Sequence, residues 1–484
     1  MFYSCVFFCG FLNSISYPFL FLLCIELTTE ENPTKRQKSS ASATAAPDQS
    51  SSEYPRPIAG AVCALPESAP RCWKGRCNSG TYSLDLQEGP TITEGKLSVK
   101  WSVPLVKCVD ASPLVLLAPS VVFTAGTPEK PNMPAHLVII GSHGGDVVAV
   151  DGASGAVVWT LQLGEHIEAS AVCDTTATKV FLGTFSGQDV DGFQSRRPVG
   201  VTSDGETELG CFWCLDALTG DIVWHVCTAG EIKGAALVID ECVFVGAYDG
   251  HLYQFRVSDG ALIGKYPCGG SIYAAPVQST DGKCIFVATT AGTLTQFAYS
   301  GGSAPLTVQG TVESAPIFAT PLATPAGGLL TAATDGSVTH WIQQSKDGRV
   351  LTPKWREVYS AKPIFSSPCL VCPTLEGVNA AQPLCLVGCH DGRLRLFQTE
   401  TGTLQWESSH NRVAVFSSPG TLSKNLSVSA TVAGEVEVTQ MSSGAVVATL
   451  QLPGEIFSSA VCLGDCVYIG CRDDRLYCLQ LASS

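Results

Sequence analysis

From about residue 97 the chain repeats a pattern of short apolar runs separated by turn residues. Each unit begins with an anchor, in which a hydrophobic residue is followed by small residues and often by proline. The eight anchors are CVDASP (108–113), HIEASA (166–171), EIKGAA (231–236), SIYAAP (271–276), TVESAP (311–316), PIFSSP (363–368), AVFSSP (414–419) and EIFSSA (455–460). Their second small residues, which define the spacing, are Ser112, Ser170, Ala235, Ala275, Ala315, Ser367, Ser418 and Ser459. The spacing indicates a period near 40 residues with insertions.

Each anchor is followed by three further apolar runs. The first is β-branched and closes on a small residue, as in CVFVGA (242–247). A turn, often Asp-Gly as at 249–250, leads to an alternating run, and a second turn leads to the last run. Asp-Gly between apolar runs indicates a hairpin, because glycine accepts a positive φ at low cost. Four short strands every 40 residues or so predict an all-β fold, an eight-bladed propeller.

The two ends of the repeat region predict how the ring closes. The last unit has no fourth run, whereas KLSVKW (96–101) stands before the first anchor as an unmatched fourth strand. We predict that residues 96–101 complete the blade begun at 455–480, which leaves no open sheet edge. Because tryptophans that share one place in a repeat are dispersed around a ring, we expect them to dock neighbouring blades and not to form a ligand cage. These tryptophans are Trp101, Trp159, Trp224 and Trp406.

Composition narrows the class of protein. Charged residues make up only 15% of the 484 residues, which favours buried strands over charged amphipathic helices. The net charge of −14 argues against a general affinity for nucleic acid or anionic membranes, since both need basic clusters. Most of the 22 cysteines lie inside apolar runs, as Cys242 and Cys284 do. This favours buried, reduced thiols in a cytoplasmic protein over the disulfides of a secreted one.

The N-terminal region differs from the repeats. Residues 1–27 are apolar and carry no charge before Glu26, but no basic residue precedes them as in a signal peptide. They are open to three interpretations: an artefactual or unstructured tail, a genuine membrane or signal segment, or a buried element. Residues 28–95 are predicted to be a low-complexity linker and lead-in. The propeller is therefore assigned to residues 96–484.

The turns that carry T-G-x-x-x-W, beside the Ser-Ser-Pro anchors, resemble the quinoprotein-type (PQQ-like) repeat. The run GEIFSSAVCLGDCVYIGCRDDRLYCLQL (454–481) resembles the C-terminal propeller of the β-alanine-activating enzyme family, also called acyl-CoA synthetase family member 4 or the aminoadipate-semialdehyde dehydrogenase homologue. The resemblance covers about residues 96–484 and implies an eight-bladed PQQ-like propeller. It also implies that longer members have an adenylating domain and a phosphopantetheine carrier domain, and act as ATP-dependent acid–thiol ligases on β-alanine.

The chain departs from that family plan where the chemistry would be. No Gly-rich adenylate-forming loop and no carrier serine in a GGDSL setting occur; residues 144–147 fit a hairpin turn and TAGTPEKP (124–131) fits a loop. We therefore predict no catalytic, cofactor-binding or metal-binding residues and no bound cofactor. The expected function is a cytoplasmic scaffold or interaction region. Its expected partners are the adenylating and carrier domains of a full-length enzyme, or another protein, and not nucleic acid.

Other functions remain open from the sequence. A quinone-dependent oxidoreductase is disfavoured because no vicinal Cys-Cys pair and no compact acidic calcium loop occur. A hydrolase with a site on the axis is a further alternative. If residues 1–27 are genuine, the chain is a membrane-anchored or secreted binding module. CFWC (211–214) and CLVC (369–372) are predicted to pack in the core, because residues i and i+3 of a strand face opposite sides. His143 and His390 share one place in the repeat, which favours a structural role.

Overall fold

The structure is a computed structural model that describes residues 58–59, 72–74, 94–117, 136–186, 200–202, 205–343, 351–371, 383–409 and 413–483. All of these described residues belong to one compact unit. The apolar segment 1–27 and the loop 124–131 lie outside the described residues. Within the described ranges the secondary structure is entirely β, and no helix is long and apolar enough to cross a bilayer.

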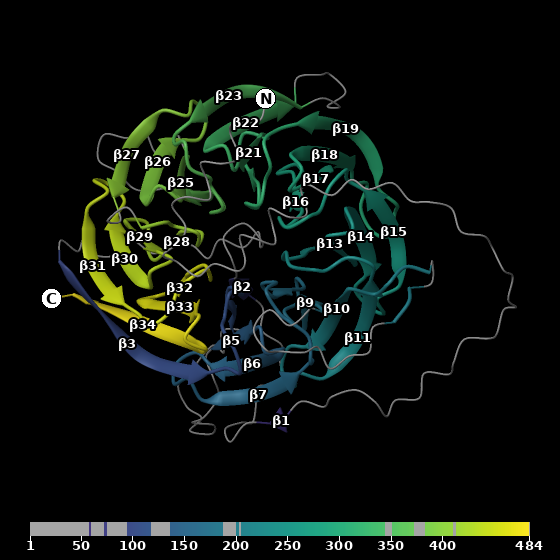
Figure 1. Cartoon of the computed structure of the whole chain (residues 1–484), viewed down its shortest axis with the longest axis horizontal. Coiled ribbons are helices and arrows are strands. Elements are labelled where there is room, and N and C mark those ends of the chain that lie inside the picture. Colours follow the sequence, from purple (N-terminus) through teal and green to yellow (C-terminus); the bar gives the residue numbers. More distant parts are fainter. Residues whose placement is uncertain are drawn as a thin grey trace, which may run out of the picture. The chain divides into compact units, whose positions relative to one another are not determined.

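Eight antiparallel sheets follow one another along the chain and are arranged radially around one axis (Figure 1). Each sheet is a blade whose strands run from the axis outward in chain order, apart from the outermost strand of the first blade and the closing strand of the last blade. The predicted eight-bladed propeller is therefore confirmed.

The strands of the first four blades, from inside outward, are as follows. Blade 1 has β4 (Leu114–Leu117), β5 (His136–Gly141), β6 (Asp146–Asp151) and β7 (Val157–Gln162). Blade 2 has β8 (Val172–Cys173), β9 (Lys179–Phe185), β10 (Gly210–Asp216) and β11 (Ile222–Thr228). Blade 3 has β12 (Leu237–Ile239), β13 (Cys242–Gly246), β14 (His251–Arg256) and β15 (Leu262–Pro267). Blade 4 has β16 (Val277–Gln278), β17 (Cys284–Ala288), β18 (Thr293–Ala298) and β19 (Thr307–Glu313).

The remaining blades follow the same order. Blade 5 has β20 (Leu322–Ala323), β21 (Leu329–Ala332), β22 (Ser337–Gln343) and β23 (Leu351–Val358). Blade 6 has β24 (Cys369–Val371), β25 (Leu384–Cys389), β26 (Arg393–Gln398) and β27 (Leu404–Ser409). Blade 7 has β28 (Gly420–Thr421), β29 (Leu426–Ala430), β30 (Glu435–Gln440) and β31 (Val446–Gln451). Blade 8 has β32 (Val461–Leu463), β33 (Cys466–Cys471), β34 (Arg475–Ser483) and β3 (Gly95–Pro104).

The core lies between neighbouring blades. Second strands such as β13 (CVFVG) are buried at every residue, whereas the fourth strand β15 (LIGKYP) is half-buried or exposed throughout. A strand covered on both faces has no solvent side, so its sequence is continuously apolar and does not alternate. This is why the β-branched runs of the repeat occupy the second strand of each blade.

The ring closes as the sequence predicts. β3 pairs antiparallel with β34, with Leu97 opposite Leu481 and Trp101 opposite Cys478. In Figure 1 the dark blue strand β3 lies beside the yellow strand β34 and completes blade 8. The closing strand extends from Gly95 to Pro104 and is thus longer than the predicted 96–101. The first and last segments of the propeller therefore share one sheet.

The predicted position of the fifth anchor is wrong. TVESAP (311–316) begins in β19, the outer strand of blade 4, and the true anchor is PIFATP (316–321). Ile317 is buried and donates its N–H to Thr289 O (3.1 Å), as Ile272 of the preceding anchor does to Ala247 O (3.1 Å). The segment holds two successive stretches of an aliphatic residue, small residues and proline, so the sequence pattern alone did not distinguish them. The reference residue of blade 5 is therefore Thr320.

Two short strands occur within the region predicted to be linker and lead-in. β1 (Ile58–Ala59) pairs with the outer strand β7, and β2 (Cys72–Lys74) pairs with the inner strand β4. Blade 1 is therefore a six-stranded sheet, with one added strand at each edge.

Replacing Trp101 with alanine is expected to lower the free energy of unfolding by about 3–5 kcal/mol. The Trp101 indole donates its Nε1–H to Gly152 O (3.2 Å) and lies against Gly155, so it joins the closing strand to blade 1. Urea unfolding followed by circular dichroism measures the change. Val99→Ala is the matched control, because Val99 lies in the same strand with 47% of its surface exposed. Equal losses of unfolding free energy in Trp101→Ala and Val99→Ala would contradict the proposed role of the closing strand.

Candidate functional site

The second small residue of each anchor takes part in a chain of hydrogen bonds around the axis. In each link the backbone N–H of one blade donates to the hydroxyl of the next. The links are Ser459 to Ser112 (2.9 Å), Ser112 to Ser170 (3.0 Å), Ala275 to Thr320 (3.2 Å), Thr320 to Ser367 (2.9 Å), Ser367 to Ser418 (2.9 Å) and Ser418 to Ser459 (2.9 Å). Ala235 and Ala275 carry no hydroxyl to accept such a bond. The anchors are thus held to one another next to the axis.

The buried aliphatic residue of each anchor fixes the anchor against the preceding blade. A Cβ added to Gly183 would overlap Ile232, and one added to Gly246 would overlap Ile272. The same overlap occurs between Gly470 of blade 8 and Val109 of blade 1. Because this approach leaves little room for a side chain, the second strands close on a small residue, glycine in these three blades. Of the two residues between these fixed positions, the fourth is always small and the third varies in chemistry.

The third anchor residues form a ring where the blades converge, which we call the mouth ring. Five consecutive blades contribute half-buried aromatic side chains, and the other three contribute charged ones. The members are Asp110, Glu168, Lys233, Tyr273, Phe318, Phe365, Phe416 and Phe457. From Tyr273 to Phe457 the centroids of successive rings lie 5.8, 5.3, 5.3 and 5.0 Å apart. The mouth ring thus has an aromatic sector in blades 4–8 and a charged sector in blades 1–3.

Arg472 joins the two sectors. Its guanidinium binds Asp110 through two bonds, Nε to Oδ1 (2.8 Å) and Nη2 to Oδ2 (2.6 Å). It also lies 3.9 Å above the centroid of the Phe457 ring. A guanidinium fits a carboxylate in this forked geometry and stacks on an aromatic face. Arg472 belongs to blade 8 and Asp110 to blade 1, so the contact spans the closure of the ring.

His143 lies between the two acidic members of the mouth ring. Its Nε2 is 3.3 Å from Asp110 Oδ2 and 3.9 Å from Glu168 Oε1. Burial opposes the imidazolium, but the charge of Asp110 and its hydrogen bond raise the pKa of His143 well above its usual value. Burial also opposes the Asp110 carboxylate, yet His143 and Arg472 hold the pKa of Asp110 well below its usual value. The charged forms of these three side chains therefore stabilise one another.

Glu168 and Lys233 complete the charged sector. Burial raises the pKa of Glu168 although Lys233 and His143 oppose the rise, and only 5% of its side chain is exposed. Within the described part of the chain Glu168 Oε1 makes no hydrogen bond. Lys233 Nζ lies 2.7 Å from Glu231 and faces the rings of Phe185 and Tyr248 at 4.6 and 4.7 Å. Both cations, Arg472 and Lys233, are thus held by a carboxylate together with an aromatic face.

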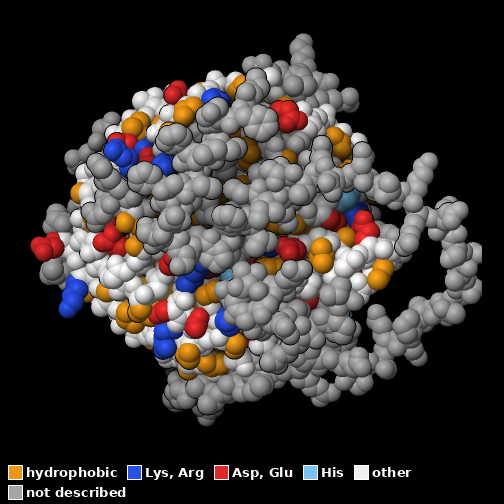
Figure 2. Space-filling model, viewed as in Figure 1, with side chains coloured by type: hydrophobic (Ala, Val, Ile, Leu, Met, Phe, Trp, Pro, Cys, Tyr) orange, Lys and Arg blue, Asp and Glu red, His pale blue; other side chains and the backbone are white. Residues whose placement is uncertain are grey.

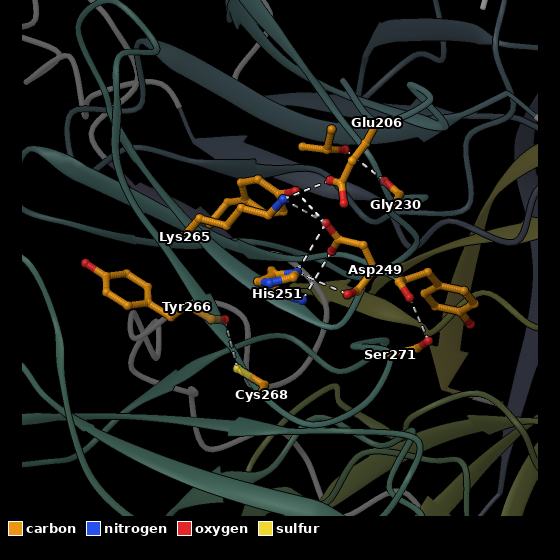
Figure 3. Close-up of polar contacts among 11 residues, drawn as sticks. Glu206, Gly230, Asp249, His251, Lys265, Tyr266, Cys268 and Ser271 are labelled. Atoms are coloured by element: carbon orange, nitrogen blue, oxygen red, sulfur yellow. Dashed lines mark hydrogen bonds and ion pairs between the residues drawn. The ribbon is translucent and has the colours of Figure 1, made fainter. Parts of the chain in front are cut away.

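A second polar cluster lies in blade 3, around Asp249 (Figure 3). The Tyr253 hydroxyl donates to Asp249 (2.5 Å), and Lys265 Nζ lies 3.2 Å from Glu206 and 3.7 Å from Asp249. The same turn position in other blades makes the same kind of contact: Asp473 accepts from Tyr477 (2.5 Å) and Asp391 from Arg395 (2.5 Å). Because this contact recurs from blade to blade, it is explained by holding the turn to the next strand. The charged sector of the mouth ring has no such repetition.

The sequence-predicted tryptophans lie on outer strands, at contacts between consecutive blades and apart from the mouth ring. Trp159 Nε1 donates to Ala217 O (3.2 Å), Trp224 to Val257 O (3.0 Å) and Trp406 to Met441 O (2.7 Å). Trp101 makes the same kind of contact across the closure. A fifth, Trp355, donates to Thr399 O (3.2 Å) and was missed because no T-G-x-x-x-W pattern precedes it.

His143 and His390 share one repeat position but differ in chemistry. His390 lies among the aromatic sector, 4.7 Å from the ring of Phe365, and burial with nearby Lys362 lowers its pKa to about 4. His143 faces the acidic residues instead. Because the two histidines share one repeat position, the sequence favoured one structural role for both. It did not indicate that their neighbours differ. Aligning the third anchor residues, with the fifth anchor at 316–321, would have shown the aromatic and charged sectors.

No group of three or more His, Cys, Asp or Glu side chains in the described ranges is placed to hold a metal ion. Figure 2 shows the described Lys and Arg side chains interspersed with Asp and Glu on the viewed face. Among the described residues, the mouth ring thus combines a run of aromatic side chains with ion pairs.

These features define an eight-bladed β-propeller, and solved structures agree on the fold. BamB from Moraxella catarrhalis superimposes with a TM-score of 0.56 at 17% identity, covering 79% of this chain and 97% of that one. The C-terminal WD40 domain of Sif2 gives 0.54 at 14% identity, covering 79% and 99%. At such identities the likeness concerns the fold alone.

A family model, described as the β-propeller of the beta-alanine-activating enzyme, matches residues 207–481, and the chain belongs to this family. The beta-alanine-activating enzyme of Drosophila melanogaster is 27% identical over 296 residues, 50% of this chain and 29% of that protein. The Danio rerio enzyme is 31% identical over 126 residues, 25% of this chain and 11% of that protein. The matched region is thus less than a third of either relative.

Replacing His143 with glutamine is expected to destabilise the chain by about 1.5–3 kcal/mol near neutral pH, and by less at higher pH. A pKa raised by folding gives stability that is present below the unfolded value of 6.5 and lost as pH rises through the folded value. Urea unfolding of wild type and variant between about pH 7 and pH 9.5 measures the difference.

His390→Gln is the matched control for this titration. The pKa of His390 is lowered to about 4, so that its side chain is neutral throughout the range and the cost of replacement stays constant. A cost for His143→Gln that does not change with pH would contradict the charged state assigned to His143.

Proposed function

We propose that the propeller is a non-catalytic interaction module of a β-alanine-activating-type enzyme and that the mouth ring is its binding surface. The observation that carries this proposal is the departure of the mouth ring from the repeat in blades 1–3. Contacts required by the fold recur in most blades, whereas this set of charges occurs once. Family membership, and the much greater length of the relatives, support a role alongside other domains.

The chemistry of the mouth ring suits a partner segment that is both apolar and cationic. The aromatic sector offers a continuous half-buried surface, and aromatic faces attract cations as well as apolar groups. Glu168 adds a buried carboxylate oxygen without a hydrogen bond in the described part of the chain. A partner that donates to this oxygen would relieve the cost of its burial. The net charge of −14 also favours a cationic partner.

The partner that we propose is the adenylating and carrier region of the enzyme, in the cytoplasm. In this arrangement the propeller holds no reacting atoms, and its closed ring presents a rigid surface to a neighbouring domain. Loops and turns on a rigid scaffold are where binding is commonly located.

The first test measures binding of this chain to the part of the Danio rerio relative that lies outside its propeller, produced as a separate chain. The double variant Phe365→Ser/Phe416→Ser is expected to weaken binding at least about tenfold, because it removes the middle of the aromatic sector. Biolayer interferometry gives the dissociation constants, and thermal unfolding confirms that the variants are folded. The matched control is Leu262→Ser/Val308→Ser, which alters side chains that are 56% and 53% exposed on outer strands. Equal binding by both double variants would overturn the role of the mouth ring.

The second test concerns catalysis by the chain alone. With ATP and β-alanine we expect no pyrophosphate release above background, since activation requires groups that offset the developing phosphate charge. With quinone and calcium we expect no quinone absorbance after gel filtration. Pyrophosphate release would contradict the non-catalytic role, and retained stoichiometric quinone would favour the oxidoreductase alternative.

A further inference from the structure

Two cysteines face each other across the outer strands of blade 2. Cys211 in β10 lies directly opposite Cys227 in β11, and their sulfur atoms are 2.7 Å apart. Directly opposed residues of an antiparallel pair bring their Cβ atoms to about 4.5–5.5 Å. A disulfide needs about 3.5–4.5 Å, so a small adjustment of the two strands is enough to form one.

The partner of Cys211 is set by strand pairing and not by the CFWC motif. Cys214, the other cysteine of the motif, lies opposite Trp224. Since residues i and i+3 of a strand point to opposite faces, Cys214 cannot reach Cys211. Cys227 comes from the neighbouring strand, 16 residues later, and has no signature in the local sequence.

The two thiols differ in access to solvent. Cys211 is fully buried, whereas Cys227 is half-buried. Thirteen of the fifteen cysteines whose side chains are described are buried, and Cys227 is one of the two that are not. An oxidant in solution therefore reaches Cys227 first, with Cys211 in place behind it.

We propose that Cys211 and Cys227 form a reversible disulfide when the protein meets a peroxide. The Cys227 thiolate attacks one peroxide oxygen, the O–O bond breaks, and hydroxide leaves as Cys227 becomes a sulfenic acid. The Cys211 sulfur then attacks the Cys227 sulfur, the S–O bond breaks, and water leaves with the Cys211 proton. In total two thiols are oxidised by two electrons and one hydrogen peroxide is reduced to two waters.

The disulfide would fasten the outer edge of blade 2. β11 carries Trp224, which donates to Val257 O of blade 3, so that this strand holds two blades together. A cross-link between β10 and β11 closes a short loop in the unfolded chain and lowers its entropy. The oxidised protein is therefore expected to unfold at a higher temperature than the reduced protein.

Cys466 and Cys478 provide an internal comparison. Their hydrogen bond and the nearby Lys100 lower the pKa of Cys466 to about 7, which favours its thiolate. However, Cys466 lies opposite Gln480 and Cys478 lies opposite Tyr468, so the two cysteines are diagonal neighbours. Diagonal neighbours are about 7–8 Å apart, with their Cβ atoms somewhat closer, so this pair is less well placed for a disulfide than a directly opposed pair. Thiolate formation alone would favour the Cys466–Cys478 pair, whereas the strand register favours Cys211 and Cys227.

The test treats the reduced full chain with hydrogen peroxide, alkylates the remaining thiols, and maps linked peptides by mass spectrometry. We expect a Cys211–Cys227 link with the loss of two hydrogen masses, reversal by dithiothreitol, and a higher melting temperature only in the oxidised form. Cys227→Ser should abolish both the link and the temperature shift. Cys214→Ser, in the same strand, should keep both.

Three results would overturn the proposal. They are the absence of the Cys211–Cys227 link after oxidation, a Cys466–Cys478 link in its place, or an equal temperature shift in Cys227→Ser. If Cys227→Ser does not fold, differential alkylation of the wild-type chain tests whether Cys211 and Cys227 become linked. In that measurement Cys211 and Cys227 must lose alkylation together on oxidation, and independent behaviour of the two would reject the pair.

Discussion

The pairing of β3 with β34 is the interaction on which the rest of the structure depends. It joins the first strand of the propeller to the last blade, and thereby brings residues from blade 8 against blade 1. The hydrogen bond from Ser459 to Ser112 and the ion pair between Arg472 and Asp110 both cross this junction. Since Arg472 also covers Phe457, the blade 8 end of the aromatic sector meets the charged sector only in the closed ring. Ring closure thus assembles the candidate binding surface as well as the fold.

A closed repeat separates structural from functional positions. The aliphatic residue and the second small residue of the anchor are held by contacts with neighbouring blades, as Ile272 and Ser367 illustrate. A change there disturbs two blades at once. The third residue varies in chemistry from blade to blade, so that phenylalanine, lysine and aspartate occupy equivalent places. Variation at the third anchor residue is therefore informative about function, because the fold tolerates it. The Asp249 cluster recurs in other blades and is not informative in this way.

The sequence predicted the features that have local causes. Asp-Gly turns and β-branched runs each reflect the conformation or packing of a few neighbouring residues, and the closing strand ending in Trp101 was predicted because the last repeat lacks its fourth run. The fifth anchor failed because Val312 and Ile317 both begin an anchor-like stretch, and only contacts with blade 4 distinguish them. The mouth ring was not predicted because the anchors were compared at the small residues that they share and not at the third residue, where their side chains and neighbours differ. His143 likewise differs from His390 in its neighbours despite their common repeat position.

The thiol pair and the mouth ring are linked through blade 2. Thr184 Oγ1 lies 3.3 Å from Cys211 O, accepts a hydrogen bond from Trp213 Nε1 (2.9 Å), and bonds to the Glu165 carboxylate. Glu165 directly precedes the anchor that carries Glu168, and Phe185 at the end of β9 faces Lys233. A cross-link in the outer strands would thus stiffen the layer that supports two members of the charged sector. Because it would leave the charges themselves unchanged, oxidation is expected to act on the rigidity of the mouth ring and not on its specificity.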